Sequence, residues 1–320
     1  MNRASIIPLK LAKRIFQKKD KILLPRISDP NAVSNIIKSV ITCDKPSMVA
    51  RLGSNELNCV LNYLSVSSGK KKKKILPYIR GNRSPWWWHD GIMRNMHLVA
   101  GFFPPTPLAL SRFSEQVLKE IEMVDVLGSW IPAEKQISHL FSPSIQLIER
   151  EVMNPFFADD PWTLALENRK ILIIHPFEET IRSQYAQRDR LFTKKILPDF
   201  ELSTLKAVQS SAKTKTTHSD WFAALNHMQK QMEEIDFDIA LIGAGAYGFS
   251  LAAHAKRLGK TGIHIGGSLQ LFFGIKGTRW EDSNYSPKYN YAQLMNEHWV
   301  KPSTPETPKN VSLVEDSCYW

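Results

Sequence analysis

The stretch DIALIGAGAYG, residues 238–248, combines the two features that decide the fold. Its first half is a continuous apolar run, which is typical of a strand buried on both faces of a sheet. Its second half is a G-x-G-x-x-G loop, in which glycines let the backbone turn sharply into the start of a helix. The stretch therefore predicts a strand, a tight turn and a helix that packs back onto the sheet.

The same alternation of strand and helix continues on both sides of this stretch. Segments with apolar residues at helical spacing separate short apolar runs. Such alternation predicts a parallel sheet covered by helices on both faces, so we expect an α/β, Rossmann-like fold with a mostly parallel sheet. The predicted strands of this half are residues 170–175, 205–209, 237–243 and 261–265, and the predicted helices are residues 178–192, 219–234 and 247–258.

The first half of the chain shows the same kinds of element at less regular spacing. The predicted strands are residues 47–52 and 123–127, the predicted helices are residues 31–42, 55–64, 91–99, 107–122 and 143–153, and residues 65–90 are predicted to be a loop. We divide the chain into three parts. These are a basic amphipathic extension (1–30), a single Rossmann-like domain (31–300) and a Pro-rich tail (301–320) that wraps the surface.

The net charge is concentrated in two short segments of the 320-residue chain. The formal charge is +11, of which residues 1–26 contribute +7 and the run Lys70–Lys74 contributes +5. A protein that grips nucleic acid spreads its Lys and Arg over a folded face, so we expect no nucleic-acid partner. From Pro8 onward the first segment has the pattern of a short amphipathic helix, for which the alternative is a solvated basic extension. We expect both segments to bind an anionic membrane surface.

Cysteine usage and the absence of long apolar runs indicate the compartment. Three widely spaced cysteines without a CxxC pair support neither a disulfide framework nor a zinc ribbon, which favours a reducing environment. No apolar run reaches the roughly 18 residues that a membrane-spanning helix needs. We therefore expect a cytoplasmic protein that is peripheral on the inner face of the cell membrane. HExxH, GxSxG and GxxxxGK[ST] motifs are also absent, which excludes the common zinc enzymes, hydrolases and P-loop NTPases.

Three interpretations of the glycine loop remain open from the residues alone. A dinucleotide cofactor such as NAD(P) needs an acidic residue at the end of the next strand, but residues 263–268 read IHIGGS. The loop is otherwise a turn that only packs helix against strand, or a cradle for the diphosphate of a nucleotide-linked substrate. On the last interpretation, Gly243, Gly245, Tyr247 and Gly248 are donor-binding residues.

The second informative segment is Arg51-Leu-Gly-Ser-Asn-Glu-Leu57, where a predicted strand ends and a helix begins. A structural interpretation makes Ser54 the N-cap of this helix and places Glu56 in its first turn, where a carboxylate suits the helix dipole. A functional interpretation places Glu56 at the carboxyl end of a parallel strand, where open α/β sheets bind ligands. There Glu56 would hold a divalent cation or a substrate hydroxyl.

This segment resembles the R-[FY]-G-D-G-E motif of the GT-D fold glycosyltransferases, with a resemblance that covers roughly residues 46–280. Arg51, Gly53 and Glu56 match the motif, whereas Ser54 replaces the family Asp and Asn55 replaces the second Gly. The resemblance implies a nucleotide-sugar donor bound by Arg51, Gly53, Ser54 and Asn55. It also implies a divalent cation (Mn²⁺ or Mg²⁺), for which Glu56 is the metal ligand that this sequence retains.

The replacement of the family Asp by Ser54 leaves the metal open, because a diphosphate-bound cation usually takes one or two protein carboxylates. The alternative is a metal-independent enzyme in which Lys276 and Arg279 neutralise the leaving diphosphate. The stretch GGSLQLFFGIKGTRW (266–280) also resembles bacterial proteins of polysaccharide gene clusters. The resemblance therefore implies a glycosyltransferase that acts on a glycan or lipid-linked acceptor in bacterial surface polysaccharide synthesis.

Two other functions and several catalytic residues stay in consideration. The chain would be an NAD(P)-dependent oxidoreductase if the glycine loop holds a dinucleotide, or a non-catalytic GT-D-like binding protein if loss of the Asp ended catalysis. For a transferase, Glu56 is a catalytic candidate, and a base near the acceptor hydroxyl would come from His175, Glu178 or Asp90. The residues around position 176 also suit an ordinary helix start, because Pro and acidic residues are common there.

Overall fold

The structure is a computed structural model, and it describes residues 3–17, 21–43, 45–68, 75–211, 214–308 and 318–320. Its centre is a seven-stranded sheet, in the order β3-β2-β1-β7-β6-β4-β5, in which every pair of neighbouring strands is parallel. The predicted α/β, Rossmann-like fold is confirmed. The strands are β1 (Ser47–Ala50), β2 (Val126–Ser129), β3 (Gln146–Glu149), β4 (Lys170–His175), β5 (Glu201–Lys206), β6 (Ile239–Ile242) and β7 (Thr261–His264).

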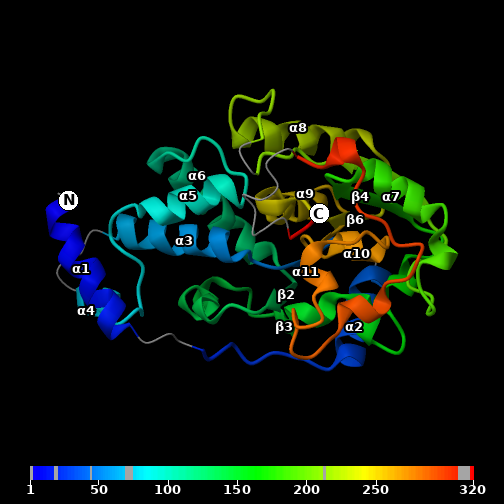
Figure 1. Cartoon of the computed structure of the whole chain (residues 1–320), viewed down its shortest axis with the longest axis horizontal. Coiled ribbons are helices and arrows are strands. Elements are labelled where there is room, and N and C mark those ends of the chain that lie inside the picture. The colour runs from blue at the N-terminus through cyan, green and yellow to red at the C-terminus, as the bar shows by residue number, and fades with distance from the viewer. Residues whose placement is uncertain (1–2, 18–20, 44, 69–74, 212–213, 309–317) are drawn as a thin grey trace.

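Helices cover both faces of the sheet because successive strand residues point to opposite sides. In β4, Leu172 and Ile174 contribute to the core on one side, and Ile171 and Ile173 contribute to the core on the other. The first core is covered by α3 (Ser54–Ser67), α5 (Asp90–Leu98), α6 (Pro107–Glu120), α8 (Trp221–Glu234) and α9 (Gly248–Arg257). The second is covered by α2 (Pro30–Thr42), α7 (Glu178–Tyr185) and α10 (Leu269–Phe272), as Figure 1 shows.

The predicted helix over residues 143–153 is wrong. The chain instead forms β3, which pairs with β2, followed by a 3₁₀ turn over Arg150–Met153. Its apolar residues fit helical spacing, but the exposed backbone edge of β2 offers hydrogen bonds that an isolated short helix does not provide. Two smaller differences concern the bounds of one strand and the content of one loop. Strand 205–209 lies earlier, at β5, because this edge strand is half solvent-facing, and the loop 65–90 contains the short helix α4 (Ile75–Ile79).

The extension before residue 30 has two parts with different surroundings. Helix α1 (Arg3–Phe16) packs against α4 at one end of the molecule, away from the sheet (Figure 1). Ile27 forms a parallel bridge to Ile148 and so borders the edge strand β3. Lys18, Lys19 and Lys70–Lys74, part of the predicted membrane-binding charge, lie outside the described residues. Within the described part of the chain, no helix is both long and apolar enough to cross a bilayer.

The tail beyond residue 301 does more than follow the surface. The carboxylate of Glu306 accepts hydrogen bonds from the backbone N–H groups of Glu179 and Thr180, and so caps the start of α7. Further along, Cys318–Trp320 returns to the carboxyl edge of the sheet, where the backbone N–H of Arg279 donates to the carbonyl of Cys318 (3.3 Å). The chain therefore brings its last residues to the edge at which α/β sheets bind ligands.

Candidate active site

Two neighbouring hollows lie along the carboxyl edge of the sheet and share the wall made by Arg51, Gly245, Gly267 and Tyr319. The first, of about 350 Å³, is the arginine hollow, which extends over the ends of β1, β2 and β3. It is lined by Ser54, Asn55, Glu56, Trp130, Arg150, Asn154, Arg279, Tyr285 and Tyr291. The second, of about 110 Å³, is the glycine-loop hollow over β4, β5 and β6, and it is lined by His175, Phe177, Val208, Gln209, Ser210, Ser211, Gly243, Tyr247, Gln270 and Trp320.

Glu56 owes its position in the arginine hollow to Gly53. The Glu56 carboxylate folds back over this glycine so closely that a Cβ at position 53 would lie 2.0 Å from Oε2. Gly53 is also the N-cap residue of α3, so the interpretation of Ser54 as the N-cap is wrong. Ser54 is the first residue of the helix and lines the hollow instead.

Arg51 lies between the two hollows and lines both of them. Its guanidinium passes along Gly266, where a Cβ would lie 2.1 Å from Nη2 and where the backbone φ of +80° also favours glycine. Burial lowers the pKa of Arg51, while the negative charge of Glu56 acts against this shift. Arg150 and Arg279 lower the same pKa through charge repulsion, which places three guanidinium groups within electrostatic reach of one another. The arginine hollow therefore carries an excess of positive charge, which favours an anionic ligand.

Arg150 is one of the residues at this site that the sequence did not indicate. Its guanidinium lies 4.7 Å from the ring centroid of Trp130, and its Nε is buried without a hydrogen-bond partner among the described residues. Trp130 is itself held by a hydrogen bond from its Nε1–H to the carbonyl of Leu52 (2.8 Å). The erroneous helix over 143–153 concealed Arg150, which in fact follows β3 directly at the carboxyl edge.

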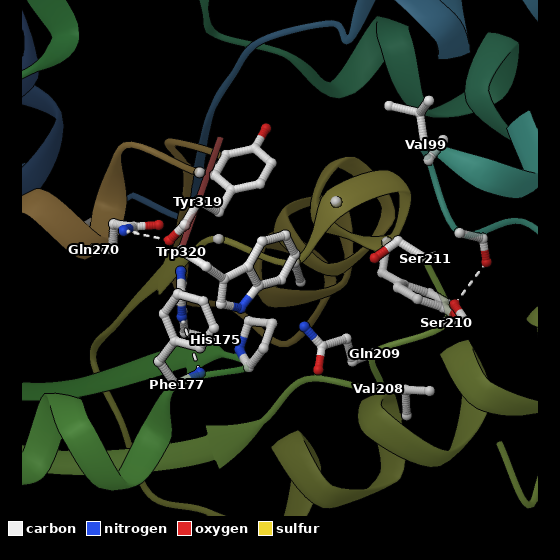
Figure 2. A pocket seen from close by; sticks show the side chains of 18 of the residues that line it. Val99, His175, Phe177, Val208, Gln209, Ser210, Ser211, Gln270, Tyr319 and Trp320 are labelled. Atoms are coloured by element: carbon white, nitrogen blue, oxygen red, sulfur yellow. Dashed lines mark hydrogen bonds between the residues drawn. The ribbon is translucent and has the colours of Figure 1, made fainter. Parts of the chain in front are cut away.

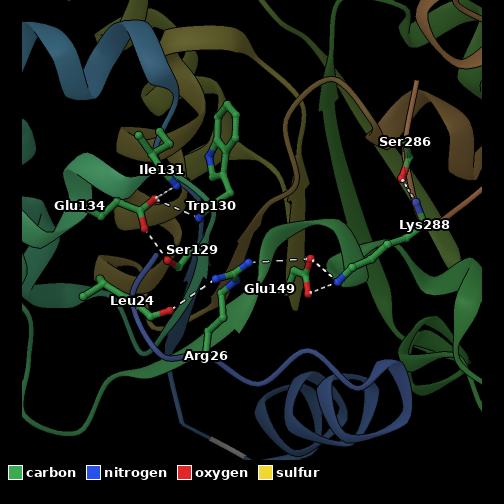
Figure 3. Close-up of polar contacts among 9 residues, drawn as sticks. All are labelled: Leu24, Arg26, Ser129, Trp130, Ile131, Glu134, Glu149, Ser286 and Lys288. Carbon is green, nitrogen blue, oxygen red and sulfur yellow. Dashed lines mark hydrogen bonds and ion pairs between the residues drawn. The ribbon is translucent and has the colours of Figure 1, made fainter. Parts of the chain in front are cut away.

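A network of polar contacts, shown in Figure 3, holds the ends of β2 and β3 in place. The buried Glu134 carboxylate accepts hydrogen bonds from the Ser129 hydroxyl (2.5 Å) and from the N–H of Trp130 (3.3 Å). Burial raises the pKa of Glu134, and these hydrogen bonds act against that shift. On β3, Glu149 accepts a charged hydrogen bond from Lys288 (3.0 Å) and pairs with Arg26 (3.9 Å). These contacts fix the residues on either side of the Trp130–Arg150 stack.

Arg279 completes the arginine hollow from the far side. Its guanidinium lies 5.0 Å from the ring centroid of Tyr319, whose ring packs against Gly267 so closely that a Cβ there would lie 2.1 Å from it. Burial raises the pKa of Tyr319, and Arg279 acts against this shift. The tail residue Tyr319 thus separates the two hollows and contacts the cation that borders one of them.

The three glycines of the loop have different structural roles. A Cβ at Gly243 would lie 2.6 Å from the His175 ring, and Gly245 adopts a φ of +51° between the two hollows. A Cβ at Gly248 would lie 2.4 Å from the ring of His264, and Gly248 lines neither hollow. The third glycine therefore makes room for a buried histidine at the end of β7, the position where a dinucleotide-binding protein carries its acid.

His175 lies in the glycine-loop hollow as a neutral donor. Burial lowers its pKa to about 3, and its Nδ1 accepts a hydrogen bond from the N–H of Phe177 (3.1 Å). The ring proton is therefore on Nε2, and this tautomer favours hydrogen-bond donation over the base role predicted for His175.

Three of the other predicted residues, Glu178, Asp90 and Lys276, lie away from the two hollows. Glu178 lines a separate hollow beside Arg182, and Asp90 is exposed at the start of α5. Lys276 lines neither of the two hollows, although its backbone N–H pairs with the carbonyl of Val300. Trp130, Tyr319 and Trp320 also line the hollows, and no local signal in the sequence identifies them, because distant contacts alone bring them to the edge.

The side chains of the arginine hollow do not by themselves form a binding site for a metal cation. Within the described residues, no group of three or more His, Cys, Asp and Glu side chains is placed to bind a metal ion. Glu56 is the one carboxylate among the described residues that line the arginine hollow, and three guanidinium groups line it as well. The predicted Mn²⁺ or Mg²⁺ would therefore find a single carboxylate in a site dominated by positive charge.

Comparison with protein families agrees with this architecture. A family model described as a GT-D fold-like domain matches residues 28–272, which is more than half of the chain. The chain belongs to the GT-D-like family. The GT-D-like domain takes in β1 to β7 and both hollows, apart from the lining residues that follow residue 272, which come from α11 (Thr278–Glu281), from the segment that holds Tyr285 and Tyr291, and from the tail. No curated protein and no solved structure matches the chain.

The pKa of His175 predicts a pH dependence of stability. Between pH 3 and 6.5 the unfolded chain binds a proton at this histidine and the folded protein does not, so the free energy of unfolding should fall as the pH is lowered. The contribution lost between pH 7 and pH 4 is about 3 kcal/mol. Urea unfolding at pH 4, 5, 6 and 7 measures it, and His175→Gln should show a weaker pH dependence than the parent protein. Identical pH dependence in the two proteins would contradict the prediction.

Proposed function

We propose that this GT-D-like protein is a glycosyltransferase that moves a sugar from a nucleotide-sugar donor to a glycan or lipid-linked acceptor of surface polysaccharide synthesis. The observation that carries the proposal is the arginine hollow, where Arg51, Arg150 and Arg279 meet at the carboxyl edge of the sheet beside Glu56. Guanidinium groups bind phosphate oxygens through paired, charge-assisted hydrogen bonds. A diphosphate with a sugar attached is an anion that suits this set of charges.

The buried polar groups of the arginine hollow support a ligand with hydroxyl groups as well. Asn154 donates to the Tyr291 hydroxyl (2.9 Å), while its own Oδ1 is buried without a partner among the described residues. Ser54 and Asn55 line the hollow next to Glu56. A buried acceptor without a partner is costly unless a ligand supplies a donor, and the hydroxyl groups of a nucleotide sugar do so.

In the proposed reaction the acceptor hydroxyl oxygen bonds to the anomeric carbon of the donor sugar. The bond from this carbon to the diphosphate oxygen breaks, and its electron pair leaves with the diphosphate. Arg150 and Arg279 stabilise the negative charge that develops there. We assign Glu56 to accept the proton of the hydroxyl, because it is the carboxylate that faces the hollow and lies near the Arg51 wall.

The charges of the arginine hollow also bear on whether donor binding needs a divalent cation. Three arginines offset a diphosphate without a metal ion, whereas one carboxylate gives a divalent cation little support from the protein. We therefore favour metal-independent donor binding for this chain. Arg150 and Arg279 take the neutralising role that the sequence analysis gave to Lys276 and Arg279.

Helix α1 supports the proposed contact with an anionic membrane. Ile7, Leu11 and Ile15 follow one another at a spacing of four residues and are 66%, 58% and 67% exposed, and the exposed Arg14 lies beside them. An exposed apolar stripe with adjacent basic residues binds at the surface of anionic lipid. We propose on this basis that the protein contacts the cytoplasmic face of a membrane, where a lipid-linked acceptor is accessible.

Exchange of Glu56 for Gln tests the proposed base. Glu56→Gln should slow nucleotide release from nucleotide sugars by about 100-fold or more, the usual contribution of a general base, while nucleotide affinity changes little. The measurement is nucleotide release from a panel of nucleotide sugars, together with calorimetric binding of the matching nucleoside diphosphate. Glu178→Gln is the matched control, because Glu178 lies in a separate hollow. Full turnover by Glu56→Gln would refute the assignment.

Exchange of Arg150 for Ala tests the diphosphate site and its independence of metal. Arg150→Ala should weaken binding of the nucleoside diphosphate about 10- to 100-fold, because a hydrogen bond to a charged group contributes about 1.5–3 kcal/mol. Arg112→Ala is the matched control, since Arg112 also stacks on an aromatic ring, Phe222, away from the two hollows. EDTA should leave the affinity of the parent protein unchanged. A requirement for Mg²⁺ or Mn²⁺ in binding would contradict metal independence.

Exchange of an α1 residue tests membrane contact. Leu11→Glu and Ile15→Glu should each reduce co-sedimentation with liposomes that contain phosphatidylserine, because each places a carboxylate in the apolar stripe. Leu108→Glu is the matched control, since Leu108 is 82% exposed on α6, outside α1. Equal sedimentation of all three variants would show that α1 does not make the contact.

A further inference from the structure

We propose that the glycine-loop hollow binds one neutral sugar unit of the acceptor. The inference rests on the proposed function in that it takes the neighbouring arginine hollow as the donor site. It assigns a ligand class to a cavity that the donor does not need, and it gives Trp320 and Gln270 a role in binding.

The charges that line this hollow favour a neutral ligand over a phosphate group. Among the described residues, Arg51 is the one permanently charged side chain that lines it, and the Arg51 guanidinium lies in the wall shared with the arginine hollow. His175 stays neutral because burial holds its pKa at about 3. The remaining lining side chains are uncharged, so the hollow suits a neutral ligand.

Two buried polar groups in the wall of the hollow have no partner among the described residues. Gln270 is fully buried, and its Nε2 donates to the carbonyls of Lys276 (3.0 Å) and Tyr319 (3.0 Å), which leaves Oε1 without a donor. The indole Nε1–H of Trp320 is likewise buried without an acceptor. Unmatched buried groups of both kinds are explained by a ligand that both donates and accepts hydrogen bonds.

The hydroxyl groups of a sugar meet this requirement, because each is a donor and an acceptor. His175 adds a third polar group, since its Nδ1 accepts from Phe177 and its Nε2 therefore carries a proton to donate. Gln209 and Ser211 extend into the same space, as Figure 2 shows. The polar groups that line the hollow thus come from several elements of the fold, which suits a ligand with several hydroxyl groups.

Trp320 supplies the apolar surface that a sugar ring also needs. In Figure 2 its indole lies across the hollow above Phe177 and His175, and the ring centroids of Trp320 and Phe177 are 6.2 Å apart. The carbonyl of Trp320 accepts hydrogen bonds from the N–H (3.3 Å) and hydroxyl (3.2 Å) of Thr278, which hold the residue in place. An indole suits a partner that is apolar on one face and polar at its edge, and a pyranose ring has this character.

The size and position of the glycine-loop hollow favour an acceptor sugar as its ligand over a second part of the donor. The glycine-loop hollow, at about 110 Å³, holds several water molecules and so a single small ring, whereas the arginine hollow is about three times larger. The shared wall of Arg51, Gly245 and Tyr319 places a ligand of one hollow next to a ligand of the other. An acceptor hydroxyl at this wall would lie beside the donor sugar.

Exchange of Ser211 for Trp tests the inference, because the indole would fill the glycine-loop hollow from a residue that does not line the arginine hollow. The probes are methyl glycosides of glucose, galactose, mannose and N-acetylglucosamine, measured by saturation-transfer difference NMR. A panel of nucleoside diphosphates, measured by calorimetry, reports on the donor site. Ser219→Trp is the matched control, since Ser219 is exposed and lines neither hollow.

We expect the parent protein and Ser219→Trp to bind at least one glycoside. Ser211→Trp should lose at least tenfold in glycoside affinity and keep its nucleotide Kd within about twofold. Trp320→Ala should weaken glycoside binding in the same way. A parent protein that binds none of the glycosides would overturn the inference, as would a tenfold loss of nucleotide affinity in Ser211→Trp, because the hollow would then hold part of the donor. Glycoside binding without any nucleotide binding would instead refute the donor proposal and leave the sugar site in place.

Discussion

The position of the Arg51 guanidinium is the constraint on which the rest of the site depends. A buried cation is unfavourable unless opposite charge and hydrogen-bonding groups surround it. Glu56 supplies the negative charge, Gly266 supplies the space, and the ring of Tyr319 closes the wall from the tail. Because Arg51 is the first residue after β1, near the middle of the sheet, its side chain divides the carboxyl edge into one charged hollow and one neutral hollow.

Several glycines near this edge are explained by the side chains that pass close to them. Gly53 accommodates the Glu56 carboxylate, Gly267 the Tyr319 ring and Gly248 the His264 ring. A strand–glycine–helix pattern suggests an approach of backbone to phosphate, but here close packing of charged and aromatic side chains accounts for two of these three positions and a buried histidine for the third. Gly245 differs, since its positive φ and its place between the hollows leave its backbone facing both.

The extent to which the sequence predicted the molecule differs between its two halves. Strands β4, β6 and β7 were predicted closely, because a strand buried on both faces is a continuous apolar run that few other elements imitate. Strand β3 was missed, because its four residues are half-exposed at one end and lie within an apolar pattern of helical spacing. That error also concealed Arg150. The motif residues Arg51, Gly53 and Glu56 were identified because they are close in sequence, and the structure places all three at the arginine hollow.

The sequence by itself determined the fold class and the motif at the end of β1, since both depend on residues that are near one another along the chain. Only the tertiary structure decided which residues share a hollow with that motif. Arg150, Arg279 and Tyr319 come from the 3₁₀ turn after β3, from α11 and from the tail, and nothing local to them indicates that they meet. They meet because parallel pairing aligns the carboxyl ends of the strands and because Gly267 and Gly277 let the tail approach the sheet. The division into a charged and a neutral hollow is therefore a property of the packed chain.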